Sequence, residues 1–180
     1  MNNDNSTKCD YFVTQTQPRV TKFLRQRCYR NLVGKLNGTF TMAYAQWVSY
    51  SILADNFSAT IKNASLSWGK FYKYDDKDNE LSPDQVNGQV IESGAEGSNV
   101  VSSCGREDSS SGTQGQFDLY DGDTKVVTLV WDCPWGSKTN SWSQTGQNKN
   151  YIVSVTGGSS YGGAIGVLTA ECFKKAQQGF

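Results

Sequence analysis

The residues with the clearest chemical potential in this sequence are tryptophans, three of which fall within the twelve residues WDCPWGSKTNSW that begin at Trp131. Trp135 lies between Pro134 and Gly136, and so short a polar loop cannot bury a large ring, so we expect it at or near the surface. An indole face attracts a quaternary ammonium group by about 0.5–2 kcal/mol, and indoles favour the membrane interface. Lys138 could contact a phosphate. The segment therefore predicts a surface that binds phosphocholine-type lipids.

The remaining tryptophans divide between core and surface. Trp131 closes a strand-like apolar run and is expected in the core, whereas Trp142 is expected at the surface. Trp47 and Trp68 are equally compatible with a buried structural position and with a ligand-binding position.

Histidine is absent from the 180 residues, which argues against most hydrolase mechanisms. Histidine is the usual general base, the commonest metal ligand and the relay residue of serine and cysteine hydrolases. An enzyme that uses a carboxylate pair such as Asp118 and Asp132 has no support beyond the presence of these residues. We expect no enzymatic activity, no cofactor and no bound metal.

An acidic run at residues 75–80 resembles the start of a calcium-binding EF-hand loop. Counted from Asp76, the sixth position is Leu81 and the twelfth is Asn87, where such a loop needs glycine and a bidentate glutamate. We therefore expect residues 75–80 to form a solvated loop.

Short β-type runs dominate the chain from residue 44 onward, and clusters of Gly, Asn, Asp and Ser separate them. A turn near Asn63 is expected to divide an apolar row, and Asp121-Gly122-Asp123 is expected to form a hairpin turn. The Gly/Ser-rich stretch at 157–163 is read as a loop without an assigned role. This spacing predicts an all-β fold, a single β-sandwich. The expected strands are 44–53, 59–68 with the turn inside, 89–92, 99–104, 116–120, 125–131, 151–156 and 164–171.

Residues 1–41 differ from the rest in charge, with seven basic and two acidic side chains, whereas residues 42–180 hold ten basic and fifteen acidic ones. The apolar spacing of this basic segment is compatible with a short amphipathic helix, such as a mitochondrial presequence or a membrane-surface helix. A disordered extension, or a wrongly assigned start with Met42 as the true one, is the favoured interpretation. We expect the β-sandwich domain to span residues 42–180.

The five cysteines are an odd number and lack the close pairing of a zinc site. Cys104 and Cys133 could form a disulfide, but the polar start of the chain is unlike a signal peptide. Buried thiols are therefore the favoured state of both residues.

Several motifs of the chain resemble the aegerolysin family, and the resemblance covers essentially all of residues 42–180. They are MAYAQWV at 42–48, NASLSWGK at 63–70, Cys104-Gly105-Arg106, FDLYDG at 117–122, WDCPWGSKTN at 131–140 and YGGAIG at 161–166. The details look most similar to the haemolysin-type members of filamentous ascomycetes.

The resemblance implies a small β-sandwich, similar to the actinoporin cytolysins, that binds membrane lipids without catalysis. Mushroom members recognise sphingomyelin with cholesterol, or ceramide phosphoethanolamine, and some recruit a perforin-like (MACPF) protein that inserts the pore. By motif position, the lipid-contacting aromatics are Trp47, Trp68 and Trp135, and the basic head-group contact is Lys138. We therefore expect a haemolysin component, peripheral on its target membrane and able to oligomerise there, that is secreted by a non-classical route or cytoplasmic.

Two departures from the family pattern leave the lipid open. Mushroom binders of sphingomyelin with cholesterol carry a glutamate where this chain has Ser111 and an aromatic residue where it has Val130. Without the anion and the stacking wall, ceramide phosphoethanolamine is as credible a ligand as sphingomyelin, and sterol dependence is open. The alternative function is a glycan-binding, lectin-like sandwich, because aromatic faces also stack on sugar rings.

Overall fold

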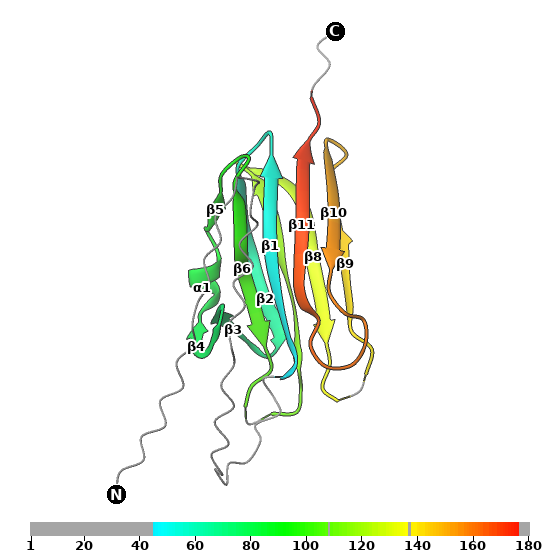
Figure 1. Cartoon of the computed structure of the whole chain (residues 1–180). Coiled ribbons are helices and arrows are strands. Elements are labelled where there is room, and N and C mark those ends of the chain that lie inside the picture. The colour runs from blue at the N-terminus through cyan, green and yellow to red at the C-terminus, as the bar shows by residue number, and fades with distance from the viewer. Residues whose placement is uncertain (1–44, 108, 137, 177–180) are drawn as a thin grey trace, which may run out of the picture. The chain divides into compact units, whose positions relative to one another are not determined.

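The computed structural model describes residues 45–107, 109–136 and 138–176, which form a sandwich of two packed β-sheets (Figure 1). This confirms the predicted fold class. The predicted extension at residues 1–41 lies outside the described residues. Within the described chain, no helical segment has the length and apolar character needed to cross a membrane.

Six strands form the first sheet and five form the second. In spatial order the first sheet contains β10 (Tyr151–Gly157), β11 (Gly166–Lys174), β1 (Trp47–Asp55), β6 (Glu96–Cys104), β3 (Lys70–Lys73) and β4 (Asp76–Leu81). The second contains β5 (Val90–Ile91), β2 (Ala59–Trp68), β7 (Thr113–Asp121), β8 (Thr124–Cys133) and β9 (Ser141–Thr145). One helical turn, α1 (Pro83–Val86), lies between β4 and β5 in the chain.

An aromatic cluster fills the space between the sheets near the middle of the sandwich. Trp131 is fully buried, as predicted, and its ring lies 5.9 Å from Tyr50 and 6.3 Å from Phe117. The indole N–H donates to the Thr113 hydroxyl at 3.3 Å, so the buried polar group is paired. Gly115 permits this packing, because a Cβ there would lie 2.7 Å from the Trp131 ring.

Two local expectations were wrong, and two further strands were missed. The turn expected near Asn63 is a bulge inside the continuous strand β2, where Asn63 adopts a φ of 55° and the register shifts between Lys62 and Ser65. The solvated loop expected at residues 75–80 is mostly edge strand β4, which pairs with β3. Strands β3 and β9 were not predicted, because neither has a long alternating apolar pattern.

Strand direction brings several connections to one end of the sandwich, the lower end in Figure 1. β1 begins at this end with Trp47, and β2, β6, β8 and β10 finish there. We call it the Trp47 end, made up of Trp47, Trp68, Gly69 and the described residues of three connections, 105–107 with 109–112, 134–136 with 138–140, and 158–165. Most of the residues with candidate binding chemistry lie here.

Candidate functional site

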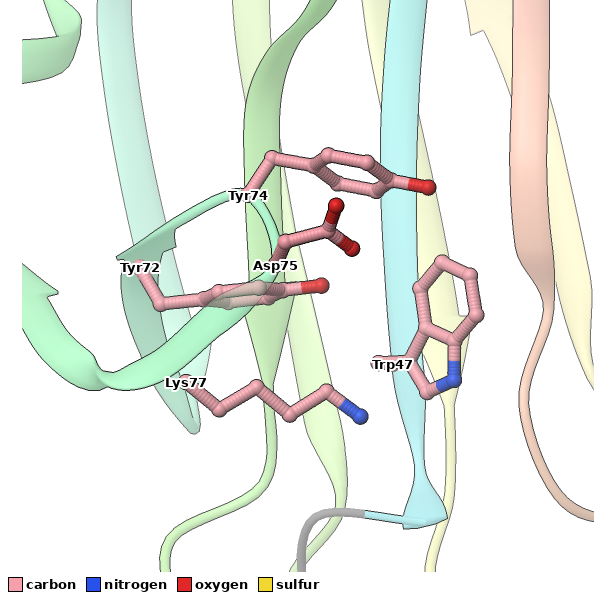
Figure 2. A pocket seen from close by; sticks show the side chains of 5 residues that line it. All are labelled: Trp47, Tyr72, Tyr74, Asp75 and Lys77. Atoms are coloured by element: carbon pink, nitrogen blue, oxygen red, sulfur yellow. The ribbon is translucent and has the colours of Figure 1, made fainter. Parts of the chain in front are cut away.

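A pocket of about 350 Å³ opens beside the first strand of the fold. Its described lining consists of Trp47, Tyr72, Tyr74, Asp75 and Lys77 (Figure 2). Three aromatic rings, one carboxylate and one ammonium group therefore meet in one small volume. We call it the Trp47 pocket.

The Trp47 pocket lies on the outer face of the six-stranded sheet because of strand alternation. On β3, Phe71 points into the core, so its neighbour Tyr72 points outward. On β1, Trp47 lies directly opposite Cys104 of β6, and β6 pairs with β3 on its other side. Trp47 and Tyr72 therefore lie on the same face of the sheet, with β6 between their two strands.

The turn between β3 and β4 supplies two more groups. Lys73 pairs with Asp76, which leaves Tyr74 and Asp75 as the turn residues. Asp75 has a φ of 68°, a left-handed conformation that aspartate tolerates better than most residues. In Figure 2 the Tyr74 ring and the Asp75 carboxylate both project from this turn toward Trp47.

Opposite charges face the aromatic rings of the Trp47 pocket. The ammonium nitrogen of Lys77 lies 5.2 Å from the centre of the Trp47 ring, which is a cation–π contact. Burial lowers the pKa of Lys77 below its usual value. Burial also raises the pKa of the Tyr72 phenol well above its usual range, so Tyr72 stays a neutral hydrogen-bond donor and acceptor at neutral pH. Both aromatic stacking and ionic contacts are available to a ligand.

A buried thiol lies beside Trp47 on the neighbouring strand β6. Cys104 is fully buried, and burial raises its pKa to about 11 against the opposing effect of the Lys70 and Lys77 ammonium groups. Cys133 is also buried, and burial raises the pKa of its thiol. Both are free thiols, which confirms the sequence-based expectation.

The four residues predicted to contact lipid all lie at the Trp47 end, but only Trp47 lines the pocket. Trp68 is 58% exposed at the end of β2. Trp135 is half-buried and Lys138 is exposed, both in the connection from β8 to β9. Trp47 therefore belongs to the pocket, whereas Trp68, Trp135 and Lys138 lie outside its lining.

The structure also locates three other residues that the sequence singled out. Trp142, expected at the surface, is half-buried and packs against the core beside Gly158. Ser111 is half-buried and accepts a hydrogen bond from Ser109 at 3.0 Å, and Val130 lines a different, polar hollow on the other sheet. The carboxylate that lines the Trp47 pocket is Asp75.

Sequence reasoning missed Tyr72, Tyr74, Asp75 and Lys77. Tyrosines two positions apart, just before a charged turn, were the available signal, because alternate residues of a strand share a face. Among the described residues, no group of three or more cysteine, aspartate or glutamate side chains could hold a metal ion. The pocket is therefore best understood through its aromatic rings and its two charges.

Comparison with known proteins agrees with this architecture. Residues 45–175 match the aegerolysin family. Asp-hemolysin of Aspergillus fumigatus is 51% identical over 135 residues, which cover 74% of this chain and 96% of that protein. Ostreolysin A6 of Pleurotus ostreatus is 40% identical over 140 residues, covering 74% and 99% respectively.

Solved structures give the same result. The crystal structure of IP-1A from Alcaligenes faecalis has a TM-score of 0.69 and 43% identity, and covers 76% of this chain and 96% of its own. RahU, solved in complex with a Tris molecule, has a TM-score of 0.70 and 40% identity, and covers 76% and 100%. In sequence and in fold, this chain belongs to the aegerolysin family.

Proposed function

We propose that this aegerolysin is a haemolysin-type, lipid-binding protein that docks on the membrane surface and recognises sphingolipid head groups. The observation that carries the proposal is the combination, in one pocket, of three aromatic rings with a carboxylate and an ammonium group. Phosphocholine and phosphoethanolamine carry the complementary pair of charges.

The ammonium end of the head group would lie against the aromatic rings and the Asp75 carboxylate. Each cation–π contact contributes about 0.5–2 kcal/mol, more when the groups are shielded from water. In the free protein the Trp47 face already has a cation near it, the Lys77 ammonium at 5.2 Å. A head group that offers an ammonium to Trp47 and a phosphate to Lys77 satisfies both side chains at once.

Asp75 provides the negative charge that Ser111 lacks. The family comparison suggested that a binder of choline needs an anion, and Ser111 does not supply one. A carboxylate from the β3–β4 turn faces the same indole, so a choline ligand keeps its counter-ion. RahU, which is 40% identical to this chain, was solved in complex with Tris, a small amine.

The remaining predicted residues would contact the bilayer around the bound head group. Trp68 and Trp135 provide rings that are suited to the membrane interface, and Lys138 provides a charge for lipid phosphate. This mode of docking is peripheral and needs no catalysis. We propose that a pore, where one forms, is completed by a perforin-like partner recruited to the bound protein.

The test is co-sedimentation of the full chain with vesicles of phosphatidylcholine, either alone or with sphingomyelin plus cholesterol or with ceramide phosphoethanolamine. Selective binding to one sphingolipid mixture is expected. Equal retention on all three would refute head-group selectivity. If protein shown to be folded by near-ultraviolet circular dichroism binds none, lipid recognition is wrong. Release from cells by free sugars would then support the glycan-binding alternative.

A further inference from the structure

Tyr161 is an unusually exposed aromatic residue in a connection to which the proposed function gives no role. Its side chain is 83% exposed, compared with 58% for Trp68. It lies in the segment Gly158–Ile165 between β10 and β11, among small residues. A large ring held this far into solvent is not packed in the core, and its apolar face and hydroxyl are both free to contact another molecule.

The connection that carries Tyr161 is held in place from the neighbouring loop. Asn140 is 2% exposed, and its side-chain N–H groups face the carbonyl oxygens of Ser159, Tyr161 and Gly163 at 3.0, 2.6 and 3.2 Å. Its backbone N–H donates to the carbonyl of Ser160 at 3.0 Å. One buried side chain therefore fixes the backbone on both sides of Tyr161.

The position of the Asn140 side chain leaves one of its atoms in an unfavourable environment. The Oδ1 of Asn140 is buried and has no hydrogen-bond partner among the described residues. A buried acceptor without a partner destabilises the fold. That the fold tolerates this arrangement is consistent with a need for the loop position itself.

The same contacts place Tyr161 beside the loop that carries Trp135 and Lys138. Asn140 closes that loop, and Cys133, at its start, donates its S–H to the carbonyl of Gly163 at 3.2 Å. Both connections lie at the Trp47 end (Figure 1). Tyr161 is thus positioned next to the groups proposed to meet the bilayer.

The chemistry around Tyr161 suits a lipid surface better than a charged protein partner. Residues 150–170 contain no acidic or basic side chain. A segment without charges can enter the head-group region without desolvating an ion. Tyrosine itself combines an apolar ring with a hydroxyl, the amphipathic combination that is enriched at membrane interfaces.

We propose that Tyr161 is an interfacial anchor that inserts into the head-group region of the target bilayer, and that Asn140 is its positioning residue. This inference rests on the proposed function, because it needs a membrane to dock on. The two proposals explain different parts of membrane binding. The Trp47 pocket selects the head group, whereas Tyr161 adds affinity for any bilayer that the pocket has selected.

The experiment compares full-length wild type with Tyr161→Ser and Tyr161→Trp on vesicles with and without the preferred sphingolipid. Ile152→Ser is the matched control, because Ile152 is 53% exposed near the start of β10, the strand that leads into the Tyr161 connection, far from the Trp47 end. Tyr161→Ser is expected to weaken binding roughly tenfold, as loss of most of one buried apolar side chain would do. Tyr161→Trp and Ile152→Ser should bind like wild type. The affinity ratio between head groups should not change.

Asn140→Ala tests the positioning role. Alone it is expected to weaken vesicle binding, but in the Tyr161→Ser background it should have no further effect, because both changes remove the same anchor. Additive losses would refute the positioning role. Thermal unfolding midpoints show whether each variant remains folded at the assay temperature.

The outcomes separate the two proposals. If wild type binds no vesicle, the proposed function and the anchor both fail. If wild type binds and Tyr161→Ser binds equally well, the anchor alone is wrong. If Tyr161→Ser changes the preference among head groups, Tyr161 belongs to recognition, which also overturns the assignment.

Discussion

The Lys77 ammonium lies over the Trp47 indole, 5.2 Å from the ring centre. The two residues come from different strands, β4 and β1, and both line the Trp47 pocket. The indole face is therefore occupied by an internal cation before any ligand arrives. Binding of an amine requires that this lysine find a new partner, which a lipid phosphate provides.

Replacement of Lys77 by methionine removes that phosphate contact while keeping the length and the apolar stem of the side chain. Lys77→Met is expected to weaken binding to the preferred sphingolipid vesicles by roughly tenfold, the value of one charge-assisted contact. Lys149→Met removes the same charge from the exposed turn before β10 and should bind like wild type. Equal losses in both variants would point to a general electrostatic effect and contradict a specific role of Lys77. Vesicle titration followed by sedimentation measures both.

Asp75→Asn tests the proposed counter-ion of the ammonium group. Asparagine also tolerates the left-handed conformation found at this position, so the β3–β4 turn should keep its shape. We expect a loss of affinity for choline-containing vesicles of about fivefold to tenfold.

Asp123→Asn is the control for Asp75→Asn, because Asp123 is exposed in the β7–β8 turn, away from the pocket. It should leave the affinity unchanged. Unchanged binding of Asp75→Asn as well would remove the carboxylate from the proposed site.

The contacts of Asp118 predict how the stability of the fold changes at low pH. Burial alone would raise its pKa, but hydrogen bonds from Thr128 at 2.6 Å and Asn63 at 2.8 Å, with the Lys125 ammonium at 3.0 Å, hold it below the usual value. A carboxyl group whose pKa is lower in the folded state stabilises the fold above its unfolded pKa of about 4. This stabilisation is lost as the pH falls through the folded pKa.

The free energy of unfolding, measured in urea, should therefore decrease below about pH 4. Asp118→Asn is expected to reduce stability at pH 7 by about 1–3 kcal/mol and to flatten the decrease in acid. If the variant and wild type lose stability in parallel as the pH falls, Asp118 does not contribute to the acid response.

The buried thiols give a prediction about chemical reactivity. Burial raises the pKa of Cys104 to about 11 and that of Cys172 to about 12, and also raises that of Cys133. In a variant with serine at positions 9 and 28, no thiol should react with Ellman's reagent at pH 8 until the protein is unfolded. All three should then react. A single reactive thiol in denaturant would reveal a disulfide.

The sequence predicted the fold well where alternation and turn chemistry agree. The row that ends at Trp131 and the hairpin turn at Gly122 both carry such signals, and β7, β8 and Trp131 lie where they were expected. Strand β4, with the sequence DKDNEL, has no apolar face because it is an edge strand that covers little of the core. Its charges made it look like a loop.

The pocket could not be predicted because it depends on the order of strands in space. Trp47 and Tyr72 share a face only because β6, which follows both in the chain, inserts between β1 and β3. Local patterns predict which residues alternate, but not which strands become neighbours. The family motifs identified Trp47 through its own segment and gave no information on the residues that surround it.

The parallel pairing of β1 with β11 has a practical consequence. The described fold starts at the Trp47 end, and its last strand runs alongside the first and finishes at the opposite end (Figure 1). A fluorescent reporter or a sensor-chip tether joined on the C-terminal side of β11 would therefore start from the end of the sandwich opposite to the Trp47 end. The same attachment placed directly before Ala45 would lie beside Trp47. Vesicle binding should therefore be weaker with the attachment before Ala45 than with the attachment after β11.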